Sequence, residues 1–171
     1  MKTSIRRKVD LEGMVKSSPE SAYEALQLYK SKVSRLRAKQ DHAEALSECA
    51  KAAALMLKYG YESSGEELSH MFTDMLDTSH KCLTPNIREL MRLISAQYRP
   101  GSEAYANFLK DCLKWSVATG DRLYGDVLLQ RELGECLWQV EGQRGAAVKH
   151  FVLGEAPEGL WMLVRAISLT A

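Results

Sequence analysis

Signals that begin and end α-helices recur along this chain, and no other feature restricts its fold as strongly. Polar side chains suited to N-capping precede apolar stretches at four points: Ser18, Asp41, Thr84 and Ser102. Prolines directly follow two of these residues, at the helix position where a missing N–H costs nothing. Glycines stand where the stretches end: Gly60, Gly120, Gly142 and Gly154. The spacing of these signals predicts a chain made of helices joined by short turns.

The apolar residues between these signals follow helical periodicity. The first stripe repeats at intervals of three and four residues: Ala22, Leu26, Tyr29, Val33 and Leu36. The second stripe is rich in alanine, which allows close packing of neighbouring backbones: Ala43, Leu46, Ala50, Ala53 and Leu57. No segment of useful length alternates with period two, so the sequence predicts no β-sheet.

About eight helices are expected, and their order suggests a repeat architecture. We predict helices near residues 19–39, 43–59, 64–79, 85–98, 103–119, 123–141, 146–153 and from 157 onward. Helix pairs then begin near residues 19, 64, 102 and 144, a period of roughly 40 residues that is typical of helical-hairpin repeats. The fold class is therefore all-α, an α-solenoid of antiparallel helical hairpins. The predicted hairpins are tetratricopeptide-like in form. Their repeats are degenerate, because the tetratricopeptide signature residues are not in register.

We expect residues 1–171 to form a single helical-repeat domain. The segment 160–169 is almost entirely apolar, whereas the last repeat of a solenoid normally has a polar outer face. This favours the interpretation that the chain is the N-terminal part of a longer solenoid. The alternatives are that this last helix is buried or that it covers a dimer contact.

Charge is distributed unevenly between the two ends of the chain. Residues 1–40 hold ten Lys and Arg against four Asp and Glu, whereas residues 41–171 hold 13 basic and 18 acidic side chains. The basic residues of the 19–39 helix lie on both flanks of its apolar stripe, and residues 6–8 extend them. An acidic protein surface is the favoured partner, because the acidic remainder would repel nucleic acid. A merely solvated charged face and a nucleic-acid-binding or general scaffold repeat are the alternatives.

The sequence gives no sign of enzymatic chemistry, of a metal or of a cofactor. Cys49, Cys82, Cys112 and Cys136 are 24 to 33 residues apart, which fits neither a zinc motif nor a dense disulfide framework. No two of the four histidines are three or four residues apart, and no glycine-rich phosphate loop or nucleophile motif occurs. No apolar run approaches the ~18 residues of a membrane span. We expect a cytoplasmic, non-enzymatic protein without direct membrane insertion.

One loop, 120–126, carries two acidic residues. Asp121 and Asp126 fit either a cation site or a turn followed by a helix N-cap, and we favour the turn and cap.

Several short motifs resemble, in the same order, those of the Golgi-to-ER traffic protein 4 family. The first group covers residues 22–30, Arg35, residues 42–45, Gly60 and residues 67–69. The second group covers residues 113–116, Gly125-Asp126, Gly134, Leu137-Trp138 and His150-Phe151 with Gly154. The resemblance extends over about residues 5–165.

This resemblance implies a cytosolic α-solenoid adaptor in the post-translational delivery of tail-anchored membrane proteins to the ER. In the family, the N-terminal half docks on a homodimeric targeting ATPase, and the C-terminal half holds a ubiquitin-like adaptor subunit. Residue by residue, it assigns docking to Tyr23, Gln27, Lys30 and Arg35, and regulation of the ATPase to Glu67. Packing, solvation and the helix macrodipole are the ordinary explanations for the same side chains.

Overall fold

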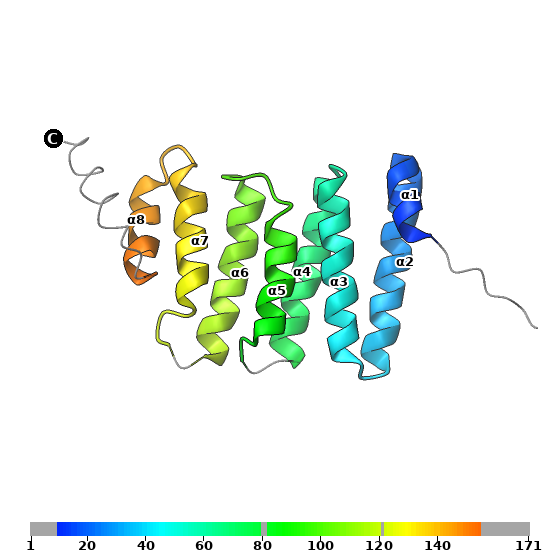
Figure 1. Ribbon diagram of the computed structural model, residues 1–171, viewed down its shortest axis with the longest axis horizontal. Coiled ribbons are helices and arrows are strands. Elements are labelled where there is room, and N and C mark those ends of the chain that lie inside the picture. The colour runs from blue at the N-terminus through cyan, green and yellow to red at the C-terminus, as the bar shows by residue number, and fades with distance from the viewer. Residues whose placement is uncertain (1–9, 80–81, 121, 155–171) are drawn as a thin grey trace, which may run out of the picture.

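The chain forms a row of helices, shown in Figure 1, that alternate in direction from one to the next. The computed structural model describes residues 10–79, 82–120 and 122–154. The helices in these ranges are α1 (Leu11–Ser17), α2 (Pro19–Ala38), α3 (His42–Lys58), α4 (Glu62–Ser79), α5 (Pro85–Ser95), α6 (Glu103–Thr119), α7 (Val127–Trp138) and α8 (Arg144–Leu153). No strand occurs in these ranges, and the predicted all-α fold is confirmed.

The helices pack as a solenoid rather than as a closed bundle. Sequential neighbours contact each other, as in α2 with α3 and α6 with α7. Contacts also join every second helix, since α2 contacts α4, α4 contacts α6, and α3 contacts α5. Helices two positions apart run in the same direction in Figure 1, so they stack as equivalent members of successive hairpins. Hairpins begin at Pro19, Glu62, Glu103 and Arg144, close to the predicted starts.

The structure corrects the predicted helices at three places. Helix α1 was not anticipated, because it has only 7 residues and is too short to show a periodic stripe. Helix α7 covers Val127–Trp138 rather than 123–141, since the Asp126 cap begins it late. Helix α4 begins at Glu62, before the serines expected to cap it. The helix predicted from residue 157 lies outside the described residues, and the single-domain assignment stays a prediction.

Helix α3 lies at the centre of the N-terminal part because its side chains are small. It contacts α1, α2, α4 and α5. Its alanines leave room for that many neighbours and are fully buried: Ala45, Ala50, Ala52 and Ala53. Gly65 of α4 extends the close packing, since a Cβ there would lie 2.5 Å from Cγ of Leu57. Three cysteines are buried as free thiols, as expected for small apolar residues, whereas Cys82 is exposed.

The loop 120–126 ends in a helix cap that also joins two hairpins. The Asp126 carboxylate accepts hydrogen bonds from the N–H groups of Leu128 (3.0 Å) and Leu129 (3.1 Å), so it is the N-cap of α7. It also accepts two hydrogen bonds from the Arg88 guanidinium of α5, at 3.0 and 2.6 Å. For Asp126 the predicted turn and cap are confirmed; Asp121 lies outside the described residues.

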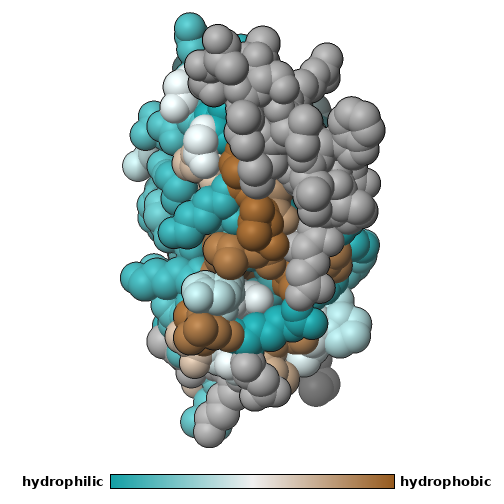
Figure 2. Space-filling model, turned by 90° about the vertical axis from the view of Figure 1, so that its left-hand side faces the viewer, coloured by the Kyte–Doolittle hydropathy of each residue, from teal (hydrophilic) through white to brown (hydrophobic). Residues whose placement is uncertain are grey.

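The end of the solenoid at α8 exposes hydrophobic side chains, as Figure 2 shows. Val152 of α8 is 58% exposed, while Phe151 beside it is buried against Gly134 of α7. The helix is therefore apolar on more than its inward side. The apolar segment 160–169 lies outside the described residues.

Candidate functional site

Three of the predicted docking residues lie on one exposed face of α2. Ser18 caps this helix with its side chain, and Pro19 begins it. The buried residues of α2 form its inner stripe: Ala22, Ala25, Leu26, Tyr29 and Val33. Because Tyr23, Gln27 and Lys30 are spaced by four and three residues, they fall within about 60° of one another around the helix, outside that stripe. Tyr23 is 63% exposed, which is unusual for a large aromatic side chain.

An ion pair connects this face of α2 to α4. The Lys30 ammonium contacts the Glu67 carboxylate, and both side chains remain accessible, at 34% and 49% exposure. The structure thus brings together Lys30 and Glu67, which are 37 residues apart in sequence. We call Tyr23, Gln27, Lys30 and Glu67 the docking face.

Arg35 points away from the docking face. It follows Lys30 by five residues, which turns it about 140° around α2. Its Nε donates a hydrogen bond to the Ser31 carbonyl oxygen at 3.1 Å, and its side chain is exposed. On that flank Lys32 pairs with Glu48 of α3, whose carboxylate also lies 3.7 Å from Lys51. The five predicted residues therefore form one group of four and one separate arginine.

Positive charge remains available at the C-terminal end of α2. Arg35, Arg37 and Lys39 are all exposed. None of the three makes an ion pair within 4.0 Å with any carboxylate of the described residues. These three positive charges are therefore not neutralised by acidic side chains of the described residues. Residues 6–8, predicted to extend it, lie outside the described ranges.

Neither a metal site nor a membrane span was found in the parts of the chain that the structure describes. Across those parts, no three His, Cys, Asp or Glu side chains are arranged to hold a metal ion. None of the helices there is both long and apolar enough to cross a bilayer. Where the chain is described, the surface features that stand out are charged and aromatic side chains suited to binding another macromolecule.

Sequence reasoning missed one cluster of polar residues. Glu62, Glu66, Tyr98 and Arg99 line a common cavity, although they come from α4 and from the connection between α5 and α6. The four-residue spacing of the two glutamates was the available signal, because it places both on one side of a helix. Their meeting with residues 98 and 99 depends on how α4 packs against the helices that follow it.

Fold and surface together define an α-solenoid with a charged face on its first hairpin. Comparison with known proteins is more specific: the family model for Golgi to ER traffic protein 4 matches residues 39–169. The chain belongs to this family. Of the five predicted site residues, only Glu67, assigned to regulation of the ATPase, falls inside the matched range.

Individual relatives agree with the family assignment. A Golgi to ER traffic protein 4 homolog from Takifugu rubripes is 30% identical over 152 residues, covering 87% of this chain and 46% of the relative. The Homo sapiens homolog is 26% identical over 131 residues, covering 75% of this chain and 40% of the relative. The chain spans about half the length of the curated relatives it matches.

A solved structure supports the fold independently. The crystal structure of C. therm. Get4 superposes with a TM-score of 0.77 and is 27% identical in sequence. The match covers 87% of this chain and 47% of that one. The predicted family and the predicted fold are both confirmed.

Proposed function

We propose that this chain is a cytoplasmic, non-enzymatic adaptor in the delivery of tail-anchored membrane proteins to the ER. Membership in the Golgi to ER traffic protein 4 family supports the pathway. The docking face of α2 and α4, together with Arg35, contacts the homodimeric targeting ATPase and regulates it. The family resemblance also implies a ubiquitin-like adaptor subunit held by the C-terminal half of the solenoid; these 171 residues match 46% of the length of the Takifugu rubripes relative.

The exposure of Tyr23 is the observation that carries the docking assignment. Its ring is 63% exposed beside Gln27 and Lys30 on one helix face, so it is free to enter a pocket on a partner. Tyrosine and arginine are enriched among the residues that dominate binding energy at interfaces. The unpaired charges at the end of α2 would steer an acidic partner and set its orientation.

Binding of the purified ATPase, measured with and without ATP, tests the proposal. Tyr23→Ala removes the aromatic contact and should weaken binding by about 30-fold, equivalent to about 2 kcal/mol. The double substitution Lys30→Glu with Arg35→Glu should mainly lower the association rate and its salt dependence. Lys110→Glu is the matched control, because Lys110 is an exposed lysine of α6, a helix that carries none of the proposed docking residues.

Two results would contradict the proposal at different levels. Full binding by the Lys30→Glu and Arg35→Glu variant would remove the docking assignment. Absence of any binding to the ATPase would remove the function. Retention on a polyanion with a steep salt dependence would instead favour the nucleic-acid alternative.

A further inference from the structure

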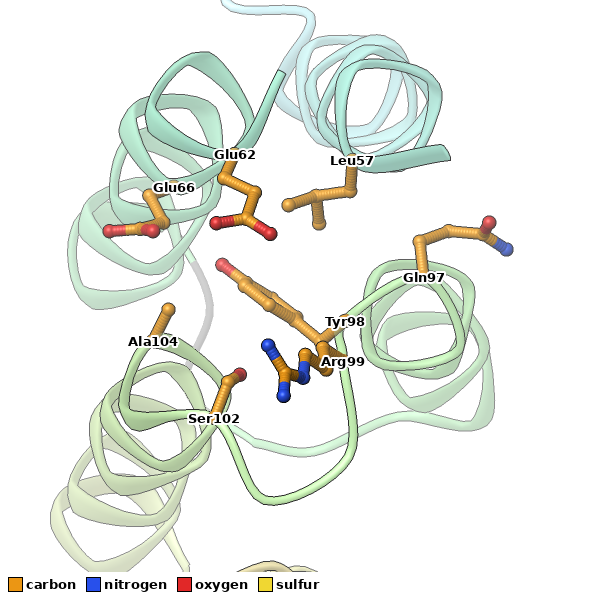
Figure 3. A pocket seen from close by; sticks show the side chains of 8 residues that line it. All are labelled: Leu57, Glu62, Glu66, Gln97, Tyr98, Arg99, Ser102 and Ala104. Carbon is orange, nitrogen blue, oxygen red and sulfur yellow. The ribbon is translucent and has the colours of Figure 1, made fainter. Parts of the chain in front are cut away.

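A cavity of about 320 Å³ opens between the start of α4 and the connection from α5 to α6. Figure 3 shows the side chains around it, with two glutamates of α4 on one side and an arginine on the other. A tyrosine ring lies between them, and a leucine borders the cavity beside Glu62. The cavity therefore combines acidic, basic and apolar groups within a space large enough for one long side chain.

The acidic side consists of Glu62 and Glu66, one helical turn apart in α4. In Figure 3 both side chains extend towards the cavity. Neither carboxylate lies within 4.0 Å of a cationic group of the described residues. Like charges at this spacing repel each other, so a cation placed between them would be held by both.

The apolar wall is rigid because it belongs to the core. The Tyr98 side chain is 8% exposed, and its ring stacks on Tyr105 and Phe108 of α6 at 5.6 and 5.7 Å between centroids. Its hydroxyl points towards the two glutamates in Figure 3. Burial raises the pKa of Tyr98 to about 12, against a hydrogen bond with Ser69 that lowers it, so the phenol keeps its proton. Leu57, which packs against Gly65, continues this wall.

The opposite side supplies hydrogen-bond donors. The Arg99 guanidinium extends into the cavity in Figure 3 and makes no ion pair within 4.0 Å among the described residues. Ser102 accepts the N–H of Tyr105 at 3.2 Å as the cap of α6, which leaves its own hydroxyl proton for another acceptor. Carbonyl oxygens of a peptide backbone are suitable acceptors for both groups.

We propose that this cavity binds a basic side chain of a partner polypeptide, arginine in preference to lysine. The guanidinium contacts Glu62 and Glu66, and the aliphatic stem lies along Leu57 and Tyr98. Neighbouring backbone carbonyls accept hydrogen bonds from Arg99. Arginine is preferred because its planar donors are able to bond both carboxylates at once, whereas the lysine ammonium is a compact point charge. The site lies apart from the docking face and does not depend on the proposed ATPase contact.

Titration of the ¹⁵N-labelled protein with acetyl-Gly-Arg-Gly-amide tests this site by NMR. Saturable shifts are expected at the backbone amides of Glu62, Glu66, Arg99 and Ser102, with a Kd of roughly millimolar order for so small a ligand. The equivalent lysine peptide should bind more weakly. The citrulline peptide has nearly the same shape without the charge, and it should bind at least about tenfold more weakly.

Substitutions distinguish binding in the cavity from a general attraction of the peptide to acidic side chains. The double variant Glu62→Gln with Glu66→Gln should weaken arginine-peptide binding at least about tenfold. Asp77→Asn, which neutralises an exposed acidic residue of α4 that does not line the cavity, should leave it unchanged. Equal shifts with the citrulline peptide, or unchanged binding by the double variant, would overturn the proposal. So would shifts spread over all acidic surfaces.

Two controls make the outcome interpretable. The thermal unfolding midpoint of the double variant shows whether the fold is retained, because acidic residues near the start of a helix also interact with its macrodipole. A variant that loses stability is replaced by the single substitution Glu66→Gln, which lies beyond the first turn of α4 and for which weaker binding with the same sites of shift is expected. Binding of the targeting ATPase by the double variant should equal that of the unchanged chain, so failure of either proposal is seen separately.

Discussion

Two regions of the solenoid each combine a residue of left-handed backbone conformation with an ion pair between helices. One is the junction between α6 and α7, and the other is the edge formed by α2 and the turn that follows it. The two regions differ in how far their groups are buried. At the junction, Gly125 has φ +79°, and a Cβ there would lie 2.6 Å from Oγ of Ser116. At the α2 edge, Gln40 has φ 61° and an exposed side chain. Gly125 is buried at the junction, whereas Gln40 at the edge faces solvent.

The two ion pairs differ in the same way. Asp126 accepts two hydrogen bonds from Arg88 and two from backbone N–H groups, and the paired side chains are 26% and 21% exposed. Lys30 and Glu67 make one contact and are more exposed. Multiple bonds and partial burial make an ion pair structurally important, while an exposed single pair contributes little to stability. The junction therefore stabilises the solenoid, and the edge leaves its charges available for recognition.

The largest effect is expected from Asp126→Ala. This substitution removes the cap of α7 and leaves the partly buried Arg88 without its partner, so the free energy of unfolding should fall by about 2–4 kcal/mol. Asp126→Asn keeps a capping oxygen and should cost less. Urea unfolding followed by circular dichroism measures both, and equal losses for the two variants would show that the ion pair with Arg88, and not the cap, accounts for the effect.

The second expected effect is on the pH dependence of stability. Burial alone would raise the pKa of Asp126, but hydrogen bonds from Arg88 and from backbone amides outweigh it and hold the pKa below its ordinary value of 3.8. The stabilisation by the Asp126 carboxylate is therefore complete above the unfolded-state pKa and is lost as the pH falls through the lower folded-state pKa. The stability difference between the unchanged chain and Asp126→Asn should be constant near neutrality and shrink below about pH 4. A pH-independent difference would contradict this assignment.

A smaller effect, of opposite sign, is expected from Gln40→Gly. The turn between α3 and α4 has Gly60 at the equivalent position, with φ +80°. In both turns the next N–H closes the helix end, from Asp41 to the Leu36 carbonyl and from Tyr61 to the Met56 carbonyl, each at 3.0 Å. Glycine adopts this backbone region without strain, so the substitution should stabilise the fold by about 0.5–1 kcal/mol. A thermal midpoint that does not rise would contradict it.

The smallest effect on stability is expected at the docking face. Coupling between Lys30 and Glu67, measured by a double-mutant cycle with Lys30→Met and Glu67→Gln, should be about 0.5 kcal/mol and should fall with added salt. A coupling above about 2 kcal/mol would mean that this pair stabilises the fold as strongly as the ion pair of Arg88 with Asp126, and the contrast between the two regions would be lost.

Helix positions were accessible to sequence reasoning wherever a local signal marked them. Ser18, Asp41, Thr84 and Ser102 cap helices as predicted, because capping needs only a side-chain oxygen two or three residues before an unpaired N–H. Helix α1 gave too short a pattern to be found.

The candidate site was only partly accessible. The shared face of Tyr23, Gln27 and Lys30 follows from their spacing, and the family resemblance supplied their docking role, which stays a prediction. The pairing of Lys30 with Glu67 came from packing. The separation of Arg35 from that group follows from its five-residue spacing after Lys30. The cavity around Tyr98 shows no continuous sequence motif, since its lining residues come from three hairpins.

The sequence by itself determined the helices, their caps, the repeat order and the basic character of the first hairpin. These properties depend on interactions between residues close together in the chain, which spacing and residue type reveal. Tertiary structure alone decided which charges are neutralised and which remain free. Lys32 and Arg35 illustrate this, since one pairs with Glu48 and the other meets no carboxylate within 4.0 Å in the described parts of the chain. Coulomb attraction depends on distances between helices, and those distances are set by how side chains such as the alanines of α3 allow the helices to approach.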